Sequence, residues 1–372
     1  MRVMMICLNR FGGTLKCASR LAQSLSRQAD LKLVVSAEAD ADLLPGGVDT
    51  VRFRTGSSAG ANLARTLNPL SYHKINRAVK MFNPDVLHFP VEHLWHFVLQ
   101  PLLGRLPMVQ TIHDPSRHLG EGSRLYDLLR RKELSWCDRI IVLSEDSRTC
   151  LLKQGVAESR VDVVEHGVFT FGSEEDGQTH CPPPPGSRRI LFAGRITQYK
   201  GLDVLLKAFP IVCRRIPDAH LTIAGKGDLE SYRPLLASLP GVVVINRYVS
   251  ERELASLHVQ SDIVVAPYLE ASQSGVIAMA LSNGRPVVAT RVGALAEQVE
   301  DKVTGHLVPP KDPAALADAI IALLSDYDGL LRMADDGRKR YEQRFGWDYL
   351  ASKTLAVYRK ALDDWLSRTE KR

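Results

Sequence analysis

Two series of continuous apolar segments, separated by a run of prolines, constrain the fold of this chain most strongly. Before the prolines, predicted strands alternate with helical patterns at residues 31–36, 51–53, 86–89, 108–112, 140–143 and 161–164. After them, the alternation resumes at residues 190–193, 219–224, 242–245, 263–266 and 286–289. Continuous apolar strands between helices are typical of parallel sheets covered on both faces. Because residues 182–185 are all proline, they end this pattern as a stiff extended spacer.

The pattern predicts an α/β fold with two Rossmann-like domains facing a cleft. We expect a first domain over residues 1–170, a linker over 171–188, a second domain over 189–345 and a C-terminal helix over 346–372. A length of 372 residues suits two cores better than one. The last segment carries an apolar stripe that includes Leu350, Tyr358 and Trp365. A helix with such a face needs a partner to bury it.

The turn after the strand at residues 190–193 carries two cations. Gly194 and Arg195 follow the strand directly, Lys200 comes five residues later, and a helical pattern starts at Gly201. In an α/β sheet this turn lies at the carboxyl edge of the strands, where ligands bind. Arginine can hold phosphate oxygens in a fork and lysine adds a point charge, so the pair is suited to a diphosphate. The alternative is two surface cations in a loop.

Composition limits the classes of partner. The net charge is only +6 without a long block of one sign, and aromatic residues make up 6%, so we expect no nucleic-acid partner. Six cysteines without a C-x-x-C pair are typical of a reduced, cytoplasmic protein. The first predicted strand begins at Arg2, and we expect no signal peptide.

Two groups of basic residues lie within amphipathic helical patterns. One comprises Arg124, Arg130, Arg131 and Lys132, and the other comprises His73, Lys74, Arg77 and Lys80. We interpret both first as solvated helix faces. The alternative is a peripheral membrane contact with anionic lipid head groups, or a contact with an anionic acceptor.

Several motifs, weak singly and strong in their order, resemble one family. They are the turn at residues 194–201, the glycine loop 11–14, and the segments 85–88, 109–114, 138–144, 161–168, 283–290 and 305–310. Together they resemble the retaining glycosyltransferases of family 4 (group 1), which have the two-domain GT-B fold. The segment 272–276, Ser-Gln-Ser-Gly-Val, resembles a variant of the family's C-terminal motif. In this family the C-terminal helix crosses back to the first domain.

The resemblance implies a metal-independent glycosyltransferase of the hexosyltransferase type, active in polysaccharide biosynthesis. The donor would be a UDP- or GDP-linked sugar and the acceptor a glycan, a lipid-linked molecule or a small molecule, with no other cofactor. The implied catalytic residues are His113, Arg195 and Lys200. The implied donor-binding residues are Gly12, Gly13, Gly194, Arg195, Lys200, Glu270, Ser272, Gln273, Ser274, Gly275 and Val276. His113 would contact the donor sugar; the alternative is a structural histidine at a strand end.

The chain departs from the family at two glutamates. The positions that match them hold Ala271 and Met279, and Glu270 lies one place from the first. Residues 274–276 should open a helix whose free amides point at the donor. The ribose contact of the second glutamate has no evident replacement.

Two other patterns suggest a metal. Asp40 and Asp42 form an Asp-x-Asp sequence, which we interpret as a solvated loop. His88, His93, His96, His113 and His118 are crowded but lack a known zinc-binding spacing. We therefore expect no metal site.

Two further function classes remain as alternatives. A nucleotide-sugar epimerase or hydrolase could share the fold, and transfer to an acceptor would distinguish them. The missing glutamates also leave a non-catalytic partner subunit, which would bind donor without turnover.

Overall fold

The computed structural model describes residues 1–56, 72–93, 95–104, 106–115, 124–167, 186–271 and 273–370, with the backbone alone at 124–129 and Glu251. The chain divides into two compact units. The first unit comprises Met1–Gly167 and Trp347–Arg372, and the second comprises Val168–Gly346. Most of the predicted linker, residues 171–185, lies outside the described residues.

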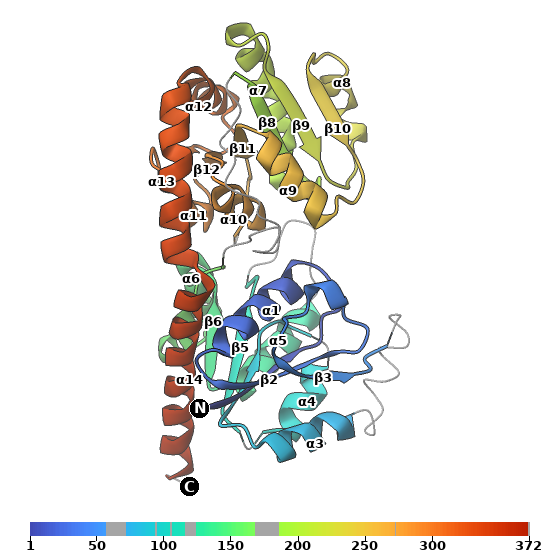
Figure 1. The fold of residues 1–372 in the computed structure, drawn as a ribbon, viewed down its shortest axis with the longest axis vertical. Helices are drawn as coiled ribbons and strands as arrows, with labels where there is room; N and C mark the ends of the chain where they lie inside the picture. The colour runs from blue at the N-terminus through green and yellow to red at the C-terminus, as the bar shows by residue number, and fades with distance from the viewer. Residues whose placement is uncertain are drawn as a thin grey trace. The chain divides into compact units, whose positions relative to one another are not determined.

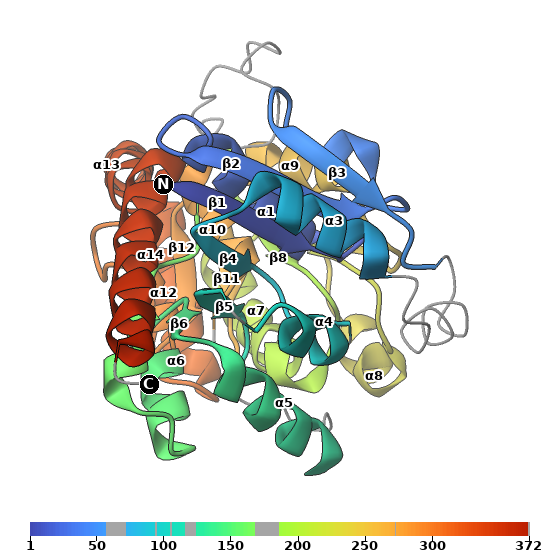
Figure 2. The same cartoon turned by 90° about the horizontal axis from the view of Figure 1, so that it is seen from below.

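The first unit is built on a parallel sheet (Figure 1). Its strands are β1 (Arg2–Cys7), β2 (Asp30–Ser36), β3 (Asp49–Phe53), β4 (Val86–Phe89), β5 (Met108–Ile112), β6 (Arg139–Val142) and β7 (Val161–Val163). They lie in the order β3-β2-β1-β4-β5-β6-β7, part of which can be followed in Figure 2. Its helices are α1 (Gly13–Leu25), α3 (His73–Phe82), α4 (His96–Leu102), α5 (Arg124–Trp136), α6 (Glu145–Lys153) and α14 (Trp347–Thr369).

The second unit repeats the plan with a six-stranded sheet. Its strands are β8 (Arg189–Ala193), β9 (His220–Ala224), β10 (Val242–Ile245), β11 (Ile263–Ala266), β12 (Val287–Thr290) and β13 (Gly305–Val308). They lie in the order β10-β9-β8-β11-β12-β13, and each printed neighbour pair is parallel. Its helices are α7 (Leu202–Arg215), α8 (Arg233–Leu236), α9 (Glu251–Gln260), α10 (Gly275–Ser282), α11 (Leu295–Gln298), α12 (Pro313–Ser325) and α13 (Tyr327–Phe345).

The C-terminal helix α14 packs within the first unit. Leu350, Leu355 and Tyr358 of its apolar stripe are buried in the core that also holds α1. The phenol oxygen of Tyr358 lies 2.7 Å from Nδ1 of His88 on β4, within hydrogen-bond distance. Lys353 forms an ion pair with Glu165 after β7 at 2.5 Å. These contacts, with the two parallel sheets, confirm the predicted α/β fold class and the placement of the last helix on the first domain.

Each sheet has one point where the strand order reverses direction. In the first unit this point lies between β1 and β4, and in the second between β8 and β11. At such a point the two loops at the carboxyl ends diverge to opposite faces and leave room for a ligand. The loops after β1 and β8 contain the predicted glycines and cations.

Candidate functional site

The turn after β8 is held by backbone hydrogen bonds to the neighbouring strand's loop. The N–H of Gly194 donates to the carbonyl of Ala224 at 2.9 Å, and the N–H of Ile196 donates to that of Lys226 at 3.0 Å. Residues Gln198–Lys200 then form one 3-10 turn, which ends at Gly201. Arg195 is exposed and Lys200 is half-buried. Both predicted cations therefore lie on a short segment whose backbone is fixed.

Lys200 lies over an aromatic ring from the loop after β11. Its Nζ is 3.8 Å from the ring centroid of Tyr268, a cation–π distance. The N–H of Leu269 donates to the carbonyl of Tyr199 at 2.7 Å, which joins the same two loops through the backbone. The loop after β11 thus sets where the Lys200 charge lies.

Tyr268 also connects this turn to the start of α10. Its hydroxyl is 3.1 Å from Oγ of Ser274, and Oγ of Ser274 accepts a hydrogen bond from the N–H of Ile277, as an N-cap does. Gln298 holds Ser274 from the other side. Its Oε1 accepts from the Ser274 N–H at 2.8 Å, and its Nε2 donates to the Ser274 carbonyl at 3.2 Å.

The first turn of α10 offers positive electrostatic potential. The N–H groups of Gly275 and Val276 precede the first acceptor available to them within the helix. Gly275 is exposed, and a Cβ placed on Gly194 would lie 3.6 Å from Cγ2 of Val276. The helix start and the turn after β8 are therefore neighbours at the reversal point of this sheet, where a helix N-terminus favours an anion.

Of the other predicted donor-binding residues of the second unit, two lie in the loop before α10 and one lies outside the described residues. Glu270 and Gln273 are half-buried in the loop between β11 and α10. Ser272 lies outside the described residues. The positions that match the family's glutamates, Ala271 and Met279, are 9% and 6% exposed. Met279 lies within α10, so an apolar side chain stands where the pattern expects a carboxylate.

In the first unit, His113 directly follows β5 and is half-buried. Burial lowers the pKa of its imidazole, which favours the neutral form, although the hydrogen bond to Pro90 and the charge of Asp114 act in the opposite direction. Its Nε2 lies 3.1 Å from the carbonyl of Pro90, so this nitrogen carries the hydrogen in the neutral ring. Nδ1 is then an acceptor, suited to a hydroxyl donor.

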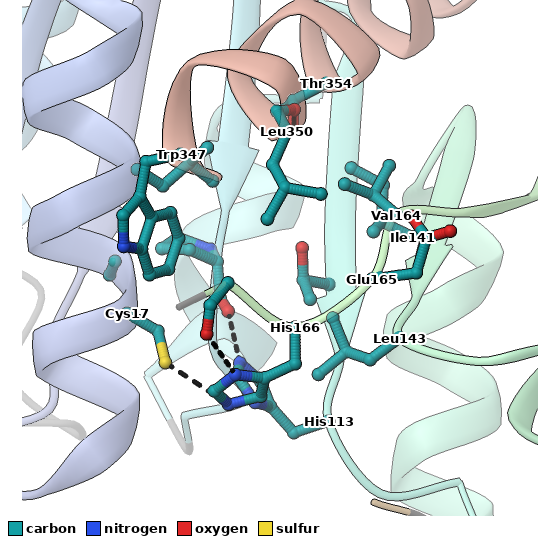
Figure 3. A pocket seen from close by; sticks show the side chains of 15 residues that line it. Cys17, His113, Ile141, Leu143, Val164, Glu165, His166, Trp347, Leu350 and Thr354 are labelled. Carbon is teal, nitrogen blue, oxygen red and sulfur yellow. Dashed lines mark hydrogen bonds between the residues drawn. The ribbon is translucent and has the colours of Figure 1, made fainter. Parts of the chain in front are cut away.

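A pocket adjoins His113 between α1, the ends of β5, β6 and β7, and the start of α14 (Figure 3). The empty space in and around its mouth, open solvent included, is about 450 Å³. Its wall includes a thiol and a second imidazole: Sγ of Cys17 lies 3.4 Å from Nε2 of His166. The other nitrogen of His166 faces the carbonyl of Gly167 at 3.1 Å, so Nδ1 carries the hydrogen and Nε2 accepts the Cys17 S–H.

Gly12 ends the loop between β1 and α1, and Gly13 is the first residue of α1. Gly12 has a φ of +86°. A Cβ added to either glycine would meet no atom within 4 Å. The loop thus leaves open space at the reversal point of the first sheet, as expected of a segment that a ligand approaches closely.

Three residues of the two patterns that suggested a metal, Asp40, His88 and His96, make contacts within the protein. Asp40 caps the 3-10 turn Ala41–Leu43, with its Oδ1 accepting from the N–H of Asp42. His96 faces Glu133 at 3.0 Å, and His88 bonds both Tyr358 and Thr111. His118 lies outside the described residues. Within the described ranges, no three His, Cys, Asp or Glu side chains are grouped so as to hold a metal ion.

The basic cluster on α5 differs in part from the solvated face that we predicted. The Arg130 side chain is only 10% exposed, because it pairs with Glu92 at 2.9 Å and donates to the carbonyls of Asp114 and Pro115. Arg130 therefore braces the loop after His113. Arg131 is exposed, Lys132 lies 5.8 Å from the Trp136 ring, and the side chain of Arg124 is not described. Among the described residues, no helix has the length and apolarity to cross a bilayer.

Sequence reasoning missed four residues that shape these sites: Tyr268, Gln298, Cys17 and His166. Tyr268 lies in the quoted segment 268–277, but its link to Lys200 depends on β8 and β11 being neighbours. No local pattern marks Gln298, which is 24 residues from its partner Ser274. Cys17 and His166 are separated by 149 residues and meet only in the folded unit.

Comparison with known proteins agrees with this geometry. The model "Glycosyltransferase Family 4" matches residues 11–170, and the model "Glycosyl transferases group 1" matches residues 187–326. A D-inositol 3-phosphate glycosyltransferase of Paenarthrobacter aurescens is 30% identical over 328 residues, which cover 76% of this chain and 80% of the relative. The phosphatidyl-myo-inositol mannosyltransferase of Mycobacterium leprae is 27% identical, with 96% of each chain covered.

Solved structures share the fold at low sequence identity. Anabaena HepE in complex with UDP superposes with a TM-score of 0.70 at 17% identity, covering 96% of this chain and 99% of that one. Sucrose-phosphate synthase from Thermosynechococcus elongatus gives a TM-score of 0.71 at 18% identity, covering 96% and 98%. With both halves matched by family models and a relative at this level of identity, the chain belongs to the group 1 and family 4 glycosyltransferases of the GT-B fold.

Proposed function

We propose that the protein transfers a hexosyl group from a UDP- or GDP-linked sugar to an acceptor hydroxyl, with retention of the anomeric configuration and without a metal ion. The observation that carries this proposal is the convergence of Arg195, Lys200 and the first turn of α10 at the reversal point of the second sheet. HepE, which shares the fold, is described in complexes with UDP and with UDP-glucose. We propose retention because the chain resembles a family of retaining enzymes. Residues 272–276 resemble a variant of that family's C-terminal motif.

The chemistry requires positive charge where the leaving group develops negative charge. As the bond between the anomeric carbon and the diphosphate breaks, electrons pass to the phosphate oxygen. The Arg195 guanidinium can donate two parallel hydrogen bonds to phosphate oxygens, and the Lys200 ammonium adds charge. The N–H groups of Gly275 and Val276 add the positive end of a helix. Because these groups belong to the chain, the leaving group needs no added cation.

His113 is assigned to the sugar rather than to the phosphates. Its neutral ring presents Nδ1 as a hydrogen-bond acceptor, since Nε2 donates to Pro90. A sugar hydroxyl is a suitable donor to that atom. The Gly12–Gly13 loop would let backbone amides approach a ligand closely.

Relatives are named for inositol 3-phosphate and phosphatidyl-myo-inositol, which makes a polyol or a lipid-linked polyol the first acceptor class to test. We propose a cytoplasmic enzyme of polysaccharide or glycolipid synthesis. Peripheral membrane contact would fall to Arg131, Lys132 and the α3 residues His73, Lys74, Arg77 and Lys80.

One experiment tests donor, metal and stereochemistry together. The purified protein is titrated calorimetrically with UDP-glucose, UDP-galactose and GDP-mannose in EDTA, then incubated with myo-inositol, inositol phosphate and methyl glucoside. We expect binding of at least one donor and a product with the donor's anomeric configuration by NMR. Donor binding without any product would favour a partner subunit, and release of free sugar would favour a hydrolase. A strict requirement for manganese or magnesium would contradict metal independence.

A further inference from the structure

The pocket beside His113 is lined mainly by hydrocarbon. Its apolar wall consists of Ala18, Leu21, Ile141, Leu143, Val164, Trp347 and Leu350. Figure 3 shows Trp347, Leu350, Val164 and Ile141 around the upper part of the pocket, and Cys17, His166 and His113 below them, with Leu143 beside His166. Burial of such a wall against another apolar surface is favourable.

The polar side chains of the wall other than His113 are hydrogen-bonded or ion-paired within the protein. Glu165 pairs with Lys353 at 2.5 Å, and Oγ1 of Thr354 donates to the carbonyl of Leu350 at 2.8 Å. Oγ1 of Thr111 lies 2.8 Å from His88, and Cys17 donates to His166. A charged or many-hydroxyl group that entered this space would lose water without gaining matching partners, which costs free energy.

The two imidazoles at the pocket add no charge near neutral pH. Burial lowers the pKa of His166 to about 4, and burial also lowers the pKa of His113. The carboxylate of Glu165 is balanced by the ammonium of Lys353. The wall therefore favours an uncharged apolar occupant over an anion or a cation.

The wall is also held in place from behind. A Cβ on Gly167 would lie 2.5 Å from the Trp347 ring, so the indole packs directly against the Gly167 backbone. Nearby, Asp348 accepts hydrogen bonds from Arg27 at 2.8 Å and from Ser24. These contacts fix the start of α14 against α1. The pocket between α14 and α1 is therefore bounded by helices that are fixed to each other.

We propose that this pocket binds the apolar part of an acceptor alcohol, an alkyl chain or hydrocarbon ring whose hydroxyl is then presented beside His113. The proposal rests on the proposed function, because His113 gives the pocket its relation to sugar transfer. It narrows the acceptor class to amphiphilic alcohols. A fully polar glycan or free polyol would leave the pocket unused.

The test uses n-alkyl β-D-glucosides from methyl to octyl, below their micelle-forming concentrations, in calorimetric titrations of the full chain. We expect affinity to rise up to about fourfold for each methylene that enters the pocket, then to level off when the pocket is full. Leu143 is only half-buried, so Leu143→Trp can fill the pocket with little risk to folding. This variant should remove the dependence on chain length while its melting temperature stays near that of the parent.

Cys17 provides a second readout inside the pocket wall. The Cys17 thiol adds across the C=C bond of N-ethylmaleimide, so that sulfur bonds to one carbon and the proton goes to the other, and peptide mass spectrometry follows the rate. Octyl glucoside should slow labelling of Cys17 several-fold and methyl glucoside should not. Cys150 and Cys213, also partly exposed, are internal controls whose labelling should not change.

The outcomes separate this proposal from the proposed function. Equal affinity for methyl and octyl glucoside, or unchanged chain-length dependence in Leu143→Trp, would overturn the pocket proposal even if UDP-glucose binds. Loss of donor binding with alkyl selectivity intact would instead overturn the proposed function and, with it, the acceptor role of the pocket. With both intact, octyl glucoside should be the better acceptor through a lower KM at similar kcat.

Discussion

The loops after β1 and after β8 occupy equivalent places in two sheets of similar strand order, yet their glycines serve different purposes. At Gly201 in the second unit, an added Cβ would lie 1.9 Å from the carbonyl oxygen of Pro267, and φ is +66°. At Gly225, which follows β9, an added Cβ would lie 1.9 Å from the carbonyl oxygen of Gly194 in the loop after β8. At Gly12 and Gly13 in the first unit, a Cβ would meet nothing within 4 Å.

The comparison shows that glycines hold loops together in the second unit and leave space for a ligand in the first. In the second unit, glycines let two loops pack backbone against backbone, which fixes the positions of Arg195 and Lys200. In the first unit, a side chain at Gly13 would not collide with any protein atom. Similar glycine-containing loops can thus allow close backbone packing in one unit and leave open space for a ligand in the other. Each substitution below tests one side of this comparison.

The largest expected effect falls on the cations of the second unit. Arg195→Ala and Lys200→Ala should each reduce the rate of sugar transfer roughly a hundredfold, because each removes charge from the leaving diphosphate. Steady-state kinetics with the donor found by titration measures this loss. Lys207→Ala is the matched control, since Lys207 is an exposed cation on α7 that pairs with Asp203 at 3.3 Å. Near-parental rates in a folded Arg195 or Lys200 variant would disprove the role of that residue.

Gly201→Ala should destabilise the protein by roughly 1–3 kcal/mol, because alanine must adopt a positive φ. The Pro267 carbonyl would also have to move to make room. Chemical denaturation followed by circular dichroism gives the change in unfolding free energy. An unchanged midpoint would show that the two loops separate at little cost, contrary to the close packing described above.

Acid should loosen the first unit before the second. Burial lowers the pKa of His88, His93 and His96 to about 3 and of His166 to about 4, whereas His258 in the second unit is lowered to about 4 and His306 less. Unfolded imidazoles take up protons near pH 6.5 and these folded ones do not. Their stabilising contribution is therefore complete above pH 6.5 and is lost as the pH falls toward 3.

Amide hydrogen exchange at pH 7 and pH 5, corrected for intrinsic rates, measures this order. Protection in β1 and β4 should fall more than protection in β8 and β11. Glu133 acts in the opposite sense, because burial raises its pKa to about 7 and its contribution is lost as the pH rises through that value. Equal loss of protection in both sheets would show that the buried histidines do not control acid stability.

The smallest expected change in stability belongs to Gly13→Ala. The position begins α1 with an ordinary φ and open space, so alanine should alter the unfolding free energy by no more than about 0.5 kcal/mol. If the open space is the approach path of a ligand, kcat/KM should nevertheless fall. Parental kinetics together with parental stability would leave the loop as an ordinary turn.

Local patterns in the sequence were sufficient to predict most strands of the two sheets and the turn that carries the two cations. The apolar segments predicted the parallel strands because a buried strand must be apolar along its length, wherever it lies in the sheet. The cations at 195 and 200 were visible because they follow a strand and precede a helix in consecutive residues. The strand β13, by contrast, was noted only as a motif, since Gly305–Val308 is short and only partly buried.

Other residues could not be assigned from local patterns. Arg285 belongs to a motif in the sequence, but its side chain is 1% exposed and donates to the carbonyls of His258 and Val259 at the end of α9. Arg130 looked like part of a solvated basic face and instead braces the loop after β5. In both cases the partners include backbone carbonyls, which every residue carries and no sequence pattern distinguishes.

The sequence by itself determined that the chain has two α/β sheets, the order of strands and helices along the chain, and the family to which the chain belongs. Tertiary structure alone decided that Tyr268 lies under Lys200 and bonds Ser274, and that Cys17 meets His166 in an apolar pocket. The physical reason is range. Strand and helix periodicity records burial at consecutive positions, whereas these contacts depend on which strands become neighbours and where their loops meet.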